Sequence, residues 1–304
     1  MTDKEGEMFY YQPSWTQGVT EAPIRALVSL TPAESKRLIA KGVATLPEVR
    51  RALEQGIVII ARGTTNAFVV EEMTGNKVEP KCHYAAGIIV DGELCATPAD
   101  TRMEPVVLRC GKADGTPAAD ALQEFREGDV SIKGASAVDP EGNAGVLAAG
   151  DDGGTIGAIL PVLLPRGSHL VVPVGLEKLI PSVAQAARAT GIFRFKYSTG
   201  LPVGLVPIPN ALVVTEVQAF QVLTGVQVVP VAAGGIAGSE GTVVLSLEGE
   251  AAQIEQALSL VKAVKGEPPV SRPAARANAA AADFNYDAMA QWQAWHGGPK
   301  SSWY

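Results

Sequence analysis

The sequence predicts an α/β protein with a three-layer, mostly parallel, Rossmann-like sheet, followed by a smaller ferredoxin-like α+β unit. Two short apolar runs, at 57–61 (IVIIA) and 169–174 (HLVVPV), are typical of central strands in a parallel sheet. Strand patterns alternate with helical patterns up to about residue 190, which favours a sheet covered by helices. Beyond residue 200 two strands follow each other directly, as in an α+β unit.

Composition narrows the class of protein. The chain of 304 residues is 47% apolar and can bury a large core. Its 25 basic and 32 acidic residues give a net charge of −7, so we expect no nucleic-acid partner. No window reaches about 18 uninterrupted apolar residues, and the first residues resemble no signal sequence, so we expect a cytoplasmic protein without a membrane partner. Three widely spaced cysteines fit reduced thiols, and we expect no metal and no cofactor.

The chain divides into four parts. Residues 1–24 are expected to form an extended N-terminal arm, and residues 25–200 an α/β ligand-binding domain. Residues 201–266 form the ferredoxin-like α+β domain, and residues 267–304 a linker with an aromatic tail.

The first elements lead into the unit around which the domain is organised. Thr31 is a good N-cap with Pro32 at the first helical position, and Pro47 starts a second helix. The strand at 57–61 then passes through a polar turn at 62–66 into a helix. Further strands are expected at 86–90, 93–96, 105–110, 130–133, 146–149, 169–174 and 193–197, and further helices at 118–126, 155–164 and 176–190.

The second unit has the order strand, helix, strand, strand, helix. Its elements are expected at 211–214, 215–223, 226–232, 242–248 and 251–265. The loop at 232–241 (AAGGIAGSEG) is longer than a hairpin requires. We therefore expect it to touch the main pocket or another subunit, the alternative being an exposed tip.

Four segments are expected to meet, because open α/β sheets bind ligands at the C-terminal ends of their strands. Glycine and hydroxyl groups at a helix N-terminus suit an anion, although a threonine there can also merely cap the helix. The segment with Lys133, Asp139 and Asn143 can be only a turn. Two aspartates come directly before Gly153 and complicate the binding of an anion there. Lys178 can form a surface ion pair with its neighbour, Glu177. The candidate ligand-binding residues are Arg62, Gly63, Thr64, Thr65 and Asn66; Lys133, Asp139 and Asn143; Gly153, Gly154 and Thr155; and Lys178.

The order of these segments resembles a known superfamily over roughly residues 50–190, with motifs GTT, KGASAVDPEGN, GDDGGTIGA and LVVPVGLEKLIP. It includes ribose-5-phosphate isomerase, glucosamine-6-phosphate deaminase, CoA transferases and lactate-utilisation (LUD) proteins. In the isomerases a similar turn holds the sugar phosphate, which the resemblance transfers to residues 61–65. Their acidic motif resembles residues 133–140, their glycine run before a catalytic glutamate resembles 150–157, and their strand ending in a lysine resembles 174–178.

Departures from the superfamily leave catalysis open. Lys133 and Ser136 stand where the isomerase motif has acids, so Asp139 is the only candidate base, and no glutamate follows Gly153-Gly154. No segment matches the glutamate motif of the CoA transferases. We therefore expect binding of a small anionic ligand that is phosphorylated, carboxylated or of CoA type, with charge from Arg62, Lys133 and Lys178. The alternative is a non-catalytic assembly protein.

Aromatic residues concentrate at the two ends of the chain, where disordered tails are normally poor in them. We expect these ends to dock. The tail after residue 282 predicts a short helix with Met289, Trp292 and Trp295 on one side. This pattern predicts a homo-oligomer held partly by exchanged tails, with packing on the same subunit as the alternative.

Overall fold

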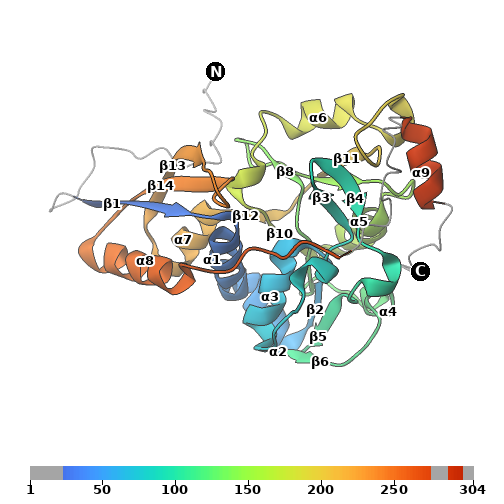
Figure 1. Ribbon diagram of the computed structural model, residues 1–304. Coiled ribbons are helices and arrows are strands. Elements are labelled where there is room, and N and C mark those ends of the chain that lie inside the picture. Colours follow the sequence, from blue (N-terminus) through green and yellow to red (C-terminus); the bar gives the residue numbers. More distant parts are fainter. Residues whose placement is uncertain (1–22, 275–286, 297–304) are drawn as a thin grey trace, which may run out of the picture.

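The computed structural model describes residues 23–274 and 287–296 and shows a mixed α/β protein (Figure 1). Its largest sheet has six strands in the order β12-β10-β7-β2-β5-β6. The first four are parallel to one another, whereas β5 and β6 add antiparallel pairs. Their bounds are β12 (Leu212–Val214), β10 (His169–Pro173), β7 (Val130–Ile132), β2 (Ile57–Ile60), β5 (Val106–Arg109) and β6 (Lys112–Ala113).

Strand β2 is buried on both faces. Val58 and Ile60 belong to a core cluster with helices α1 (Pro32–Thr45), α2 (Pro47–Gln55) and α3 (Thr64–Thr74). The alternate residues Ile57 and Ile59 belong to a second cluster with α4 (Ala118–Gln123) and α5 (Gly154–Arg166). Burial on both faces explains why the strand is a continuous apolar run.

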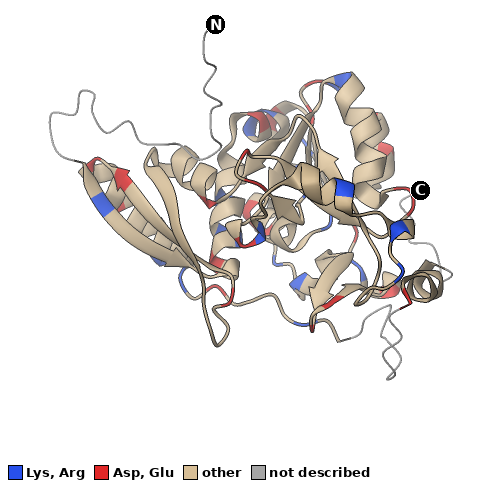
Figure 2. Ribbon diagram, turned by 90° about the horizontal axis from the view of Figure 1, so that it is seen from above, with Lys and Arg blue, Asp and Glu red and all other residues tan. Residues whose placement is uncertain are grey.

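The helix starts predicted from Thr31 and Pro47 are confirmed. Thr31 and Glu34 form a capping box at α1, and Pro32 and Pro47 stand at the first positions of their helices. None of the helices in the described ranges combines the length and apolar character needed to cross a membrane. Basic and acidic positions are interspersed along the ribbon in the view of Figure 2.

A second, antiparallel sheet has the order β1-β14-β13 and packs against α7 and α8. The strand at 211–214, expected to lead this unit, is β12 and instead pairs with β10. Its place is taken by β1, which pairs with β14 along its whole length and was not anticipated. The bounds are β1 (Ile24–Leu30), β13 (Gln227–Gly234), β14 (Thr242–Gly249), α7 (Glu216–Thr224) and α8 (Ala251–Val264). Each sheet thus contains a strand from the other side of the boundary expected near residue 200: β1 joins the second sheet, and β12 joins the first.

Smaller elements complete the fold, and two of them differ from the sequence prediction. The helix expected at 176–190 is a 3-10 turn followed by a short helix, because Pro181 lacks the N–H that a continuous helix requires. The strand expected at 193–197 begins as a 3-10 turn. The elements are η1 (Lys81–Tyr84), β3 (Gly87–Val90), β4 (Glu93–Ala96), η2 (Ala99–Thr101), β8 (Ala137–Val138), β9 (Ala144–Ala148), η3 (Leu176–Lys178), α6 (Val183–Ala189), η4 (Ile192–Arg194) and β11 (Gly204–Ile208).

Helix α9 (Ala288–His296) packs on its own chain (Figure 1). The Trp292 indole N–H donates to the Ala149 carbonyl at 2.8 Å, and its ring meets Phe193 edge-on at 5.3 Å between centroids. The structure holds one chain, so an exchange of tails between subunits stays a prediction. The aromatic residues expected to dock from residues 1–22, and Phe284, Tyr286, Trp303 and Tyr304, lie outside the described residues.

Gly42 lets α1 and α7 approach closely. A Cβ atom at residue 42 would lie 2.8 Å from the Ala219 Cα, which is closer than real contacts allow. Gly42→Ala should therefore push the helices apart and lower the free energy of unfolding by about 1–3 kcal/mol, measured by urea denaturation. Gly128→Ala is the matched control, because nothing lies within 4 Å of a Cβ there. Equal stabilities of the two variants would contradict this packing.

Candidate functional site

Charged side chains gather where the four parallel strands end. Lys133 directly follows β7, and Glu177 and Lys178 lie in η3 after β10. Glu216 opens α7 after β12. The C-terminal ends of parallel strands share one edge of a sheet, and α1 adds a further lysine there. We refer to Lys36, Lys133, Glu177, Lys178 and Glu216 as the lysine–glutamate cluster.

Glu177 forms an ion pair, and its carboxylate occupies space that is free because Gly175 has no side chain. Its Oε1 lies 2.9 Å from the Lys36 Nζ, and the two side chains are only 12% and 10% exposed. Its Oε2 is buried without a hydrogen-bond partner among the described residues. A Cβ at Gly175 would lie 1.7 Å from that oxygen, so the carboxylate occupies the space of the missing side chain. Burial opposes ionisation, but Lys36 and Lys178 outweigh it and lower the pKa of Glu177.

Glu216 is fully buried. Its Oε2 accepts a hydrogen bond from the Leu176 backbone N–H at 2.9 Å. The other oxygen, Oε1, accepts no hydrogen bond of ordinary geometry among the described residues, but the Ser35 hydroxyl group, which is also buried, interacts with this carboxyl group and opposes the rise of its pKa. Burial, followed by the neighbouring charge of Glu177, raises the pKa of Glu216 to about 7. A carboxyl group of this kind can take up or release a proton near neutral pH.

The two lysines of the sheet edge have different surroundings. The Lys133 Nζ donates to the Gly134 carbonyl and the Lys178 Nζ to the Ala135 carbonyl, each at 3.0 Å. Burial and the charge of Lys178 lower the pKa of Lys133 to about 8. Burial also lowers the pKa of Lys178, with Lys36 adding to the shift and Glu177 and Glu216 opposing it.

Asn66 joins two of the strand ends. Its Nδ2 donates to the carbonyls of Ala61 at 2.7 Å and Ile132 at 3.0 Å, which ties β2 to β7. Its Oδ1 is buried without a partner among the described residues. The N-cap of α3 is Gly63, so neither Thr64 nor Thr65 occupies the capping position. The start of α3 therefore retains backbone N–H groups of the kind that suit an anion.

Two of the predicted site residues have structural partners instead. The buried Arg62 donates to the Met103 carbonyl at 2.7 Å and pairs with Glu104 at 2.9 Å, so its charge is compensated between β2 and β5. Asp139, the only candidate base in the sequence, is also buried. Its carboxylate accepts hydrogen bonds from the backbone N–H groups of Glu141, Asn143 and Val183 and from the Asn143 amide. It holds a turn and the start of α6.

The remaining predicted residues support loops. The Asn143 Nδ2 donates to Asp139, as part of the same turn. Gly153 and Gly154 have φ angles of 77° and 56° at the start of α5, a left-handed conformation that favours glycine, and Thr155 follows within the helix. The loop before them lies beside α9, where Asp151 is 3.4 Å from His296.

The loop between β13 and β14 touches the cluster at its base. A Cβ at Gly241 would lie 3.3 Å from the Glu177 Cβ and 3.1 Å from the Pro32 Cγ. The base of the loop thus lies beside Glu177, whereas Ile236 at its tip is 81% exposed, and the expected contact with a ligand pocket or another subunit stays a prediction.

Sequence reasoning missed Lys36 and Glu216 as site residues and considered Glu177 only as a surface partner of Lys178. An acidic residue directly after an N-cap, such as Glu216 after Thr215, normally complements the helix dipole at the surface. The available signal was its position immediately after a strand of the parallel sheet. No family model, curated protein or solved structure matches this chain.

Proposed function

We propose that the chain binds a small anionic ligand bearing hydroxyl groups, phosphorylated or carboxylated, at the lysine–glutamate cluster of a Rossmann-like, isomerase/CoA-transferase-like domain. The observation that carries this proposal is the meeting of Lys133 and Lys178 with two buried acceptor oxygens, Glu177 Oε2 and Asn66 Oδ1, that lack partners among the described residues. Lysines recognise the anionic group, whereas acceptors recognise hydroxyl donors.

The lysines supply the attraction for the anion. The Lys133 and Lys178 ammonium groups each donate to one carbonyl and form no ion pair within 4.0 Å among the described residues. Each ammonium group has three donors, so both can donate to a phosphate or carboxylate. The nearby start of α3 adds backbone N–H groups and a positive helix end.

The acceptors favour a hydroxylated ligand. Glu177 Oε2 and Asn66 Oδ1 are buried without partners among the described residues. A buried polar atom that lacks a hydrogen bond costs about 1–3 kcal/mol, so such atoms need a functional or solvent explanation. Ligand hydroxyl groups would satisfy them. Glu216 is also better suited than Asp139 to move a proton, because its pKa is about 7, whereas the Asp139 carboxylate accepts several hydrogen bonds that hold a turn.

A ligand screen tests this proposal. Ribose 5-phosphate, glucosamine 6-phosphate, malate and a CoA ester would be added to the full chain, and the melting temperature measured. A compound present at 100 times its dissociation constant stabilises the folded state by about 2.7 kcal/mol. We expect a shift with at least one hydroxylated anion, and no comparable shift with a neutral polyol.

Gly175→Ala identifies the site of binding. The new methyl group should displace the Glu177 carboxylate, which is a flexible side-chain end, so the fold should persist while the ligand shift is lost. Gly87→Ala on β3 is the control, because nothing lies within 4 Å of a Cβ there. Lys178→Met should abolish the shift as well. The proposal is wrong if no anion in the panel shifts the melting temperature, or if both site variants retain the full shift.

A further inference from the structure

We propose that Lys133 is a nucleophilic amine that forms an imine with an aldehyde or ketone group of the ligand; this inference rests on the proposed function of the same site. Two of the three lysines of the cluster would then have different roles. Lys178 would hold the anionic group, and Lys133 would attack the carbonyl carbon.

The fold fixes Lys133 firmly. It follows β7, a central strand, and its backbone N–H donates to the Val171 carbonyl of β10 at 3.0 Å. Its side chain is half-buried, and the Nζ donates to the adjacent Gly134 carbonyl. A fixed main chain and a short tether restrict where the amine can lie, which favours attack on a bound carbonyl group.

The charges around the two lysines are unequal. Lys178 is influenced by the carboxylates of Glu177 and Glu216 and by the ammonium of Lys36. Lys133 is influenced by the positive charge of Lys178. A lysine that is partly shielded from water and lies beside another cation is activated as a nucleophile. Lys178, with two carboxylates, is the better of the two at keeping its proton.

The neutral amine is well populated at Lys133. A pKa of about 8 leaves about 9% of the amine unprotonated at pH 7, whereas an ordinary lysine has about 0.04%. The neutral fraction is therefore about 200-fold larger than at an exposed lysine.

Gly134 places the Lys133 amine near the Asn66 acceptor. A Cβ at residue 134 would lie 3.7 Å from both the Asn66 Oδ1 and the Pro173 carbonyl oxygen, an ordinary contact distance. The carbonyl that the Lys133 Nζ contacts therefore belongs to a residue beside the Asn66 acceptor, so the amine and this acceptor lie at the same edge of the sheet.

The reaction balances without an oxidant or reductant. The Lys133 nitrogen attacks the carbonyl carbon, and a proton moves from nitrogen to oxygen to give a carbinolamine. The C–O bond then breaks and water leaves, so that one carbonyl and one amine give one imine and one water. Glu216 is the group of the cluster suited to exchange the proton that leaves with the water.

Reductive trapping tests the proposal on the full chain. Glyoxylate, a small anionic aldehyde, would be added with sodium cyanoborohydride, and carboxymethylated lysines located by peptide mass mapping. At pH 7 we expect Lys133 to be labelled at least about tenfold faster than any other lysine, with a rate that rises to a plateau above about pH 8. Neutral acetaldehyde should label Lys133 more slowly.

Two variants add controls. Lys133→Arg keeps the charge but should abolish the selective label. Lys178→Met removes the neighbouring charge and should raise the pKa of Lys133, so labelling by neutral acetaldehyde should slow at pH 7 but not at pH 10. Labelling by glyoxylate should slow at both pH values, because the variant also lacks the ammonium group that holds the carboxylate. The mapping of the unaltered chain decides the question even if a variant does not fold.

The outcomes separate the two proposals. If glyoxylate raises the melting temperature without reductant but labels all lysines evenly, the imine is wrong and the binding site stands. If Lys133 is labelled selectively and equally fast by glyoxylate and acetaldehyde, the amine is reactive but recognition of an anion is wrong.

Discussion

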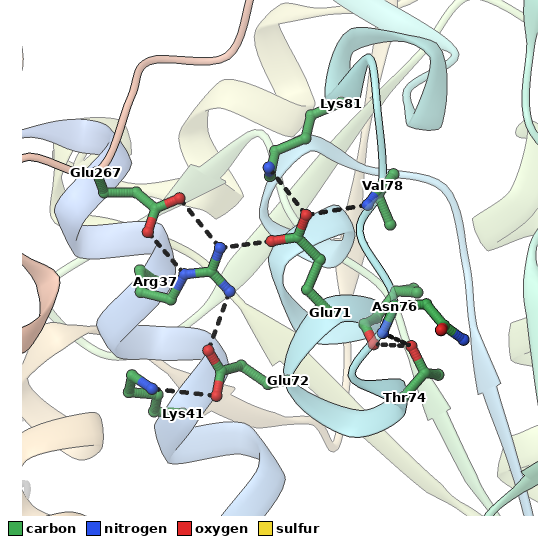
Figure 3. A network of polar contacts seen from close by, with 10 residues as sticks. Arg37, Lys41, Glu71, Glu72, Thr74, Asn76, Val78, Lys81 and Glu267 are labelled. Atoms are coloured by element: carbon green, nitrogen blue, oxygen red, sulfur yellow. Dashed lines mark hydrogen bonds and ion pairs between the residues drawn. The ribbon is translucent and has the colours of Figure 1, made fainter.

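Replacing Arg37 by Met is expected to lower the free energy of unfolding by about 3–5 kcal/mol, because it removes the cation that three largely buried carboxylates share, two of which then keep only a lysine as ion-pair partner. The Arg37 guanidinium lies among Glu71, Glu72 and Glu267 and donates to all three (Figure 3). Its side chain is 9% exposed, and the three carboxylates are 5%, 20% and 15% exposed. The network joins α1 to α3 and to the segment after α8.

Most of the expected loss of stability comes from the Glu71 carboxylate. Burial raises its pKa, but hydrogen bonds from the Val78 N–H, Arg37 and Lys81 outweigh burial and lower the pKa to about 2. Without Arg37 the carboxylate retains only the Val78 and Lys81 contacts. The packing of the guanidinium over the Phe68 ring, 4.8 Å from its centroid, would also change.

Urea denaturation at pH 7 measures this effect. Arg25→Met is the matched control, because Arg25 also pairs with a glutamate, Glu248, but its side chain is 51% exposed. Exposed ion pairs contribute about 0–1 kcal/mol, so the control should lose little stability. Equal losses in the two variants would show that the network contributes no more than a surface ion pair.

The sequence predicted elements whose signals are local. Thr31 and Pro32 identified the start of α1, and the apolar run before Gly63 identified β2 and α3. Strand β1 was not predicted, because its partner β14 lies more than 200 residues away in the sequence. In addition, Leu27 points outward and is 72% exposed, which obscures the alternation of apolar and polar residues along the strand. Pairing partners depend on tertiary contacts that local propensity does not encode.

The position of three candidate site residues could be predicted because the strands that precede them have local sequence signals. Asn66, Lys133 and Lys178 follow strands of the parallel sheet, and the structure places all three at its C-terminal edge. Asp139 was nominated because it is the acid that remains in the segment resembling the isomerase motif. Its carboxylate accepts several backbone hydrogen bonds and therefore supports the fold, and those bonds are visible only in three dimensions. The environment of Glu216 depends on β12 joining β10, a pairing that the sequence pattern did not predict.

Glu216→Gln is expected to raise the free energy of unfolding at pH 8 by about 3 kcal/mol. The pKa of Glu216 is about 7 in the folded protein and about 4.3 in an unfolded chain. The folded state therefore binds the proton more tightly, and the ionised carboxylate destabilises the fold fully above pH 7 and not below about pH 4.3. Glutamine removes the charge and keeps an oxygen that can accept from the Leu176 N–H.

Urea denaturation at pH 5 and pH 8 distinguishes this cause from a general packing effect. The gain should be several times larger at pH 8, because the wild-type carboxyl group is mostly protonated at pH 5. Glu255→Gln on the exposed side of α8 is the control and should change stability by less than about 0.5 kcal/mol at either pH. A gain of the same size at both pH values would show that ionisation of Glu216 is not its source.

The same variant should bind the proposed ligand more weakly. A buried carboxyl group that destabilises the fold persists where function requires it, so stability and function are expected to change in opposite directions. In the ligand screen, Glu216→Gln should therefore have a higher melting temperature alone and a smaller shift with ligand than the unaltered chain. An undiminished shift would place Glu216 outside the binding site, and its raised pKa would then be a property of the fold alone.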